Sequence, residues 1–136
     1  MISNRERLRN AINNHDVVLR GVSALEYMEL FVGYINEQQT EVYSTHNLCV
    51  NYNNSLVKNF DHIDYFVEGL VRCSTFNQVV NDMLDEYDTM DASALAEALS
   101  EYHEINGSFD NITVEPRNLI RFQEMQDWAL EFHCGA

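Results

Sequence analysis

The sequence contains little proline and glycine and no long hydrophobic run. Each of these shortages excludes a class of protein. One proline and five glycines in 136 residues argue against fibrous or low-complexity chains. No apolar run approaches the roughly 20 residues needed to cross a bilayer. Residues 1–7 lack the hydrophobic segment of a signal peptide. We expect one folded domain over residues 1–136, located in the cytoplasm, with no membrane contact.

Cysteine is also scarce. Cys49, Cys73 and Cys134 are far apart and odd in number, whereas disulfide-stabilised secreted domains carry a denser, even set. We therefore expect free thiols, with Cys73 in the core because its neighbours are apolar. His46 and His133 add one loose and one terminal ligand pair, whereas zinc sites need two tight pairs at defined spacing. Neither a metal nor a cofactor is predicted.

Positively charged residues are scarce in this chain. Twenty-two acidic residues face eight lysines and arginines, which gives a net charge of −14. Between Asp61 and Asp110, Arg72 is the single cation among twelve acidic residues. Such a field repels phosphates and disfavours nucleic acid as a partner, but it accelerates association with a basic protein. Solubility alone would also explain the acidity, so that alternative stays open.

The first half of the chain is predicted to mix helices with short strands. Ser23 is the candidate N-cap of the second helix, because its hydroxyl can accept from the free backbone N–H groups that follow. The predicted elements are a basic helix at about 4–13, strands at 17–20, 41–44 and 48–50, a helix at 23–34, and a polar break at 51–55.

The second half is predicted to form a hairpin followed by three helices. The hairpin covers residues 63–73 and turns at Glu68-Gly69, where the glycine can adopt a positive φ. This order favours an α+β fold, a single compact domain with short strands. The signals that bound the helices are a capping box at Thr75 and Gln78, an N-cap at Asp91, a C-terminal Gly107 and an N-terminal Pro116.

The acidic cluster at residues 82–91 is the first candidate for a metal-binding site. Asp82 shares a helix face with Asp85 or Glu86, so a divalent cation is geometrically feasible. The cluster lacks the glycine of calcium loops and has no nearby base, and a solvated helix face is the better interpretation. The chain also lacks G-x-S-x-G, P-loop and G-x-G-x-x-G motifs. We expect a protein that is not an enzyme.

Arginines at positions 5, 7 and 9 form the one basic cluster. They could contact phosphate, or they could hold the first helix on the acidic body of the same protein and offset part of its self-repulsion.

Four segments, taken in order, resemble the C-terminal domain of AbiEi-type abortive-infection antitoxins. The likeness begins in the strand and "SAL" helix start of residues 17–30 and extends to about residue 110. The remaining segments are Tyr65–Cys73 (YFVEGLVRC), Ser74–Leu84 (STFNQVVNDML) and the alanine-rich helix from Asp91 to Ile105.

Members of that family neutralise a nucleotidyltransferase-like toxin and repress their own promoter through an N-terminal winged helix-turn-helix. Only about fourteen residues precede the first predicted strand, too few for such a domain. The resemblance therefore implies the protein-binding half alone, without a catalytic set.

Together these observations predict a non-catalytic domain that binds a basic, toxin-like protein. The alternative is an accessory or structural domain that self-associates through the aromatic last helix, with Phe122, Trp128 and Phe132. Homo-oligomer formation is left open, and a small enzyme ranks third. The candidate partner-binding residues are Asp82, Asp85, Glu86, Asp88, Glu97, Glu101 and Glu104.

Overall fold

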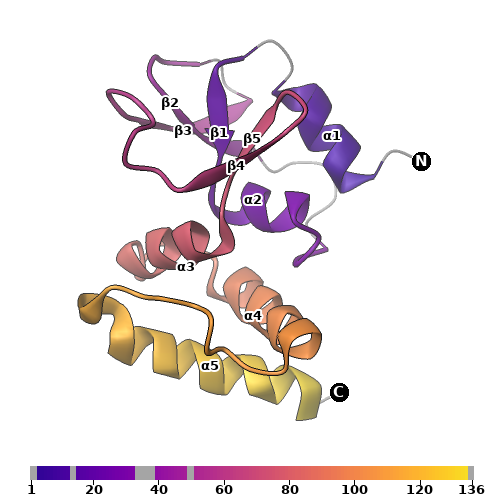
Figure 1. The fold of residues 1–136 in the computed structure, drawn as a ribbon, viewed down its shortest axis with the longest axis vertical. Coiled ribbons are helices and arrows are strands. Elements are labelled where there is room, and N and C mark those ends of the chain that lie inside the picture. Colours follow the sequence, from indigo (N-terminus) through magenta and orange to yellow (C-terminus); the bar gives the residue numbers. More distant parts are fainter. Residues whose placement is uncertain (1–2, 13–14, 33–38, 49–50, 135–136) are drawn as a thin grey trace.

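The computed structural model describes residues 3–12, 15–32, 39–48 and 51–134, with side chains up to residue 131. Figure 1 shows a sheet with two helices at one end of the molecule and three helices stacked at the other. This arrangement confirms the predicted α+β fold class.

Five strands form one mixed sheet in the order β3-β2-β1-β5-β4. The first strand, β1, lies at the centre, antiparallel to β2 and parallel to β5. β3 pairs parallel to β2, and β4 pairs antiparallel to β5. The strands are β1 (Val17–Leu19), β2 (Thr40–Ser44), β3 (Tyr52–Leu56), β4 (Tyr65–Glu68) and β5 (Val71–Ser74).

The helices divide into two groups. The first two pack together beside the sheet, α2 also contacts the third, and the last two form a pair (Figure 1). The helices are α1 (Asn4–Ala11), α2 (Gly21–Tyr27), α3 (Phe76–Asp85), α4 (Ala92–Asn106) and α5 (Leu119–Cys134), with a 3₁₀ turn η1 (Pro116–Asn118) before the last.

Local signals correctly predicted the start of α3 and both ends of α4, whereas Pro116, predicted to begin the last helix, begins the 3₁₀ turn before it. The Thr75 hydroxyl accepts from the backbone N–H of Gln78 at 3.3 Å and caps α3. Asp91 caps α4 by accepting from the N–H of Ala94 at 3.0 Å, and Gly107 ends that helix with φ of 81°. Cys73 lies fully buried in the core, as predicted.

The predicted start of the second helix is wrong. Gly21, with φ of 53°, is separated from the strand by Arg20 alone, and α2 begins at Gly21. Ser23 therefore lies inside the helix, and its hydroxyl accepts from the N–H of Glu41 on β2 at 2.9 Å. A serine two residues after such a glycine is too late in the chain to be the cap.

The strand prediction is also corrected in two places. Residues 51–55, interpreted as a polar break, supply most of β3, an edge strand whose side chains are half-buried or exposed. Of the predicted strand at 48–50, residue 48 is not in a strand and residues 49–50 lie outside the described part. The hairpin is confirmed, but it turns at Gly69-Leu70, where Gly69 has φ of 63°. A glycine at the first turn position suits a two-residue hairpin loop.

Candidate functional site

The structure divides the seven predicted partner-binding carboxylates into two groups. Three of them, on or just after α3, are already engaged within the molecule. Asp82, with 11% of its side chain exposed, accepts hydrogen bonds from the Tyr43 hydroxyl and from Gln78. Asp85 accepts two hydrogen bonds from the Arg117 guanidinium, each of 2.9 Å. These contacts remove Asp82 from any contact face, and they partly neutralise the other α3 carboxylates.

The second group lies on α4 and on the turn before it. Asp88, Glu101 and Glu104 are exposed, and Glu97 is half-buried. One Glu97 oxygen accepts from the backbone N–H of Val32 at 3.1 Å. That hydrogen bond fixes the Glu97 carboxylate beside the end of α2.

Glu97 and Glu101 line a depression of about 380 Å³ between α1, the end of α2 and α4. Four carboxylates and one cation line it, over a floor of three apolar residues. Its described lining is Asn4, Arg5, Glu26, Glu29, Leu30, Phe31, Val32, Glu97 and Glu101. We call it the acidic depression. A cationic side chain with an apolar stem fits this combination of charge and floor.

Glu26 is the innermost carboxylate of the acidic depression. Only 1% of its side chain is exposed, and it is paired with Arg7 of α1. Burial raises the pKa of Glu26 to about 7, against the lowering effect of Arg7. The charge at the base of the depression therefore changes within the neutral pH range.

A second polar cluster surrounds Arg20, at the junction of β1 and α2. The Arg20 guanidinium donates to Glu86 at 2.7 Å and to the Ser55 hydroxyl at 3.1 Å, and it stacks over the Tyr43 ring. Burial lowers the pKa of Arg20, but the Glu86 hydrogen bond and nearby charges raise it overall, so the group stays charged. Sequence reasoning missed this cluster because its members come from four separate segments of the chain.

Glu41 lies beside Arg20 and faces the start of α2. It accepts from the N–H of Val22 at 3.0 Å, and a Cβ placed on Gly21 would approach its oxygen to 2.7 Å. Burial raises the pKa of Glu41. These residues border a cavity of about 570 Å³, which one arginine and three carboxylates line.

The described residues offer no reactive group in this cluster. Burial raises the pKa of the Tyr43 hydroxyl beside Arg20 to about 12. Outside this cluster, burial also raises the pKa of the Cys73 thiol, on β5, to about 12, so neither group ionises readily. No three histidine, cysteine, aspartate or glutamate side chains within the described ranges are arranged to hold a metal ion. The hydrogen bonds of Arg20 join the sheet to α3, and this joining role accounts for the cluster.

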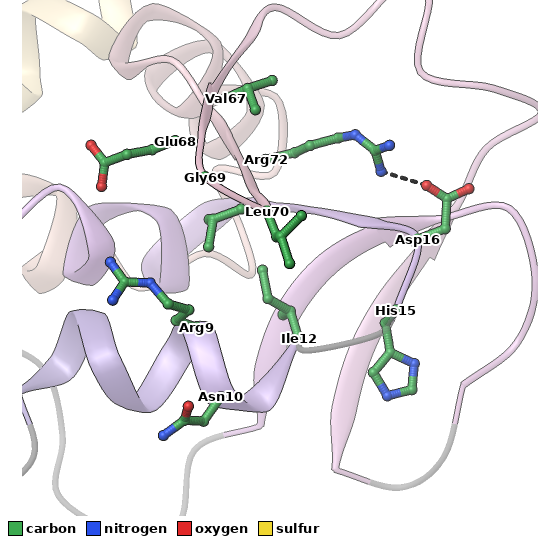
Figure 2. Close-up of a pocket in the computed structure, with 11 residues that line it drawn as sticks. Arg9, Asn10, Ile12, His15, Asp16, Val67, Glu68, Gly69, Leu70 and Arg72 are labelled. Carbon is green, nitrogen blue, oxygen red and sulfur yellow. Dashed lines mark hydrogen bonds and ion pairs between the residues drawn. The ribbon is translucent and has the colours of Figure 1, made fainter.

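A further cavity, of about 730 Å³, lies between the end of α1, the start of β1 and the β4–β5 turn. Figure 2 shows Ile12 and Leu70 at its centre, with the Arg72–Asp16 ion pair on one side. Arg9 and Glu68 lie toward the other side (Figure 2). Two arginines and two carboxylates thus line this cavity, which we call the hairpin groove.

The N-terminal arginines hold α1 on the protein body. Arg5 pairs with Glu68, and Arg7 pairs with Glu26. Arg9 makes no ion pair with any carboxylate that the structure describes. The alternative in which these arginines hold the first helix on the body of the same protein is thus confirmed for Arg5 and Arg7.

The last helix presents fewer aromatic residues than expected. Phe122 is 5% exposed and belongs to the core, because that face of α5 packs on α4. Trp128 is 40% exposed, and the Phe132 side chain lies outside the described part. Phe122 is therefore withdrawn from any self-association surface.

Comparison with known proteins adds no further assignment: no protein family, curated protein or solved structure matches the chain. Within the described ranges, every helix is too short or too polar to span a bilayer.

Proposed function

We propose that this chain is a non-catalytic binding domain of the cytoplasm that recognises a basic protein through the acidic depression. The observation that carries the proposal is the lining, in which Glu29, Glu97 and Glu101 accompany a single Arg5, above a buried Glu26 that is paired with Arg7. The apolar floor adds hydrophobic contact for the stem of a lysine or arginine. The resemblance to AbiEi-type antitoxin domains suggests a nucleotidyltransferase-like toxin as that protein.

If recognition is electrostatic, the affinity for the partner depends on salt concentration. A basic partner should associate fast at low ionic strength and bind more weakly as salt screens the charges, because the Debye length falls from roughly 10 Å at 0.1 M to roughly 3 Å at 1 M. An affinity that does not change with salt concentration would contradict the proposal.

The test starts with a pull-down from the native host, followed by reconstitution with the purified partner and calorimetric titration. The triple variant Glu29→Gln, Glu97→Gln, Glu101→Gln should weaken binding by at least about tenfold, since each close charge pair contributes on the order of 1 kcal/mol or more. The matched control Asp61→Asn, Asp110→Asn, Asp127→Asn removes the same charge at exposed positions elsewhere. Equal weakening by both variants would show that net charge acts without a site.

A further inference from the structure

The β4–β5 turn carries an unusually exposed apolar surface. Leu70 is 93% exposed, the most of any large apolar side chain in the described residues, and Val67 is 63% exposed. Both border the hairpin groove, so a projecting apolar tip lies directly beside a cavity of about 730 Å³ (Figure 2). Exposed large apolar side chains that gather beside a cavity are typical of contact sites.

The same region contains an open sheet edge. β4 ends the strand order, and among the described strands only β5 pairs with it. An edge strand presents backbone N–H and C=O groups to whatever chain approaches it. Val67 and Glu68 belong both to β4 and to the hairpin groove, so the edge and the cavity are continuous.

Charge identifies the occupant. Two copies that each carry −14 repel one another, so they can approach only where the surface charge is balanced. The hairpin groove meets that condition, because Arg72 pairs with Asp16, Arg5 pairs with Glu68, and Arg9 adds one further cation. The acidic depression has four carboxylates against one cation, and the cavity beside Arg20 has three against one.

From these observations we propose that the hairpin groove is the contact surface between two copies of this chain. Around a two-fold axis, the exposed Leu70 of each copy packs into the groove of the other, against the Leu70 that lies at the centre of that groove. Such a contact is self-complementary, as a two-fold dimer requires, because Leu70 and the groove that receives it belong to one surface. Arg9, without an ion-pair partner in its own described chain, then faces carboxylates of the second copy.

Sedimentation velocity over a range from about 1 to about 200 μM protein tests the proposal, because a reversible dimer follows mass action. The wild-type chain should shift from monomer to dimer. The dimer should strengthen as NaCl increases, since salt screens the repulsion between two acidic molecules. A chain that stays monomeric over the whole range overturns the proposal.

Variants locate the interface. The double variant Val67→Thr, Leu70→Ser should raise the dimer dissociation constant at least about tenfold, because each dimer loses the apolar contact area of two leucines. The matched control Leu119→Ser, Ile120→Ser removes exposed apolar surface from α5 and should leave association unchanged. A dimer lost in the α5 control and kept in the hairpin variant would refute the assignment.

A charge reversal provides a separate test. Arg9→Glu makes the groove lining negative in both copies and should weaken the dimer most at low salt. Lys58→Glu, an equal reversal at an exposed position outside the groove, is the control. If both reversals weakened the dimer equally, the cause would be net charge, and the assignment of the interface to the hairpin groove would be overturned.

Discussion

Gly21 shows how a single residue determines the start of an element. Its φ of 53° allows α2 to begin with Arg20 alone between it and β1, and its missing side chain leaves space for the Glu41 carboxylate. An L side chain there meets two obstacles at once, because left-handed backbone costs about 1–2 kcal/mol and the carboxylate blocks the Cβ position.

Replacement of Gly21 should therefore cost more than replacement of a glycine with free space. Gly69 has a similar φ of 63°, but no atom lies within 4 Å of its added Cβ. We expect Gly69→Ala to lower the free energy of unfolding by about 1 kcal/mol and Gly21→Ala by at least about twice that. Urea denaturation followed by circular dichroism measures both, and equal losses would show that Glu41 moves aside without cost.

At the scale of elements, α1 is attached by apolar and charged contacts. Leu8 is fully buried and Ile12 is 5% exposed, while Arg5 and Arg7 pair with carboxylates on the hairpin and on α2. The Arg7 contact depends on pH, because burial raises the pKa of Glu26 to about 7.

The sign of this dependence follows from proton binding. Between about pH 4.5 and 7 the folded chain holds a proton on Glu26 that the unfolded chain has released, so stability falls as pH rises through that window. The full effect is on the order of 3 kcal/mol at about 1.4 kcal/mol per pKa unit. In urea titrations at several pH values, Glu26→Gln should remove this decline, whereas Asp110→Asn should retain it. An unchanged pH profile in Glu26→Gln would contradict the assignment.

The success of sequence prediction also differs among elements. The start of α3 and both ends of α4 were predictable because Thr75, Asp91 and Gly107 act on neighbours a few residues away. β3 was not, since Tyr52–Leu56 has no apolar pattern of its own and forms a strand only through its parallel pairing with β2. Hydrophobic periodicity cannot indicate such a strand.

The candidate site was predicted only in part for the same reason. Glu97 and Glu101, two of the predicted partner-binding residues, line the acidic depression, but Glu26 and Glu29 come from a distant helix end that only the fold brings near. The ion pair between Arg20 and Glu86 spans 66 positions in the sequence. No spacing rule relates residues so far apart.

For the whole molecule, repulsion among like charges should govern how stability responds to salt. The ion pairs of Arg72 and Arg117 are largely exposed and contribute little, whereas a net charge of −14 acts over the entire surface.

Raising NaCl from about 0.05 M to about 0.5 M should therefore increase the urea midpoint of unfolding, since the Debye length falls well below the size of the domain. The measurement is repeated on Val67→Thr, Leu70→Ser, so that self-association cannot account for the gain. A midpoint that falls with salt would mean that the ion pairs outweigh the repulsion.

The order of the strands has a consequence for synthesis. The strand at the centre of the sheet, β1, is translated first, but its parallel neighbour β5 ends at Ser74. A nascent chain therefore leaves one flank of β1 uncovered until more than half of the protein has been translated. During that interval the apolar run Val17–Leu19 depends on α1, α2 and β2 for shelter, so truncated products that end before residue 71 are the ones most exposed to aggregation.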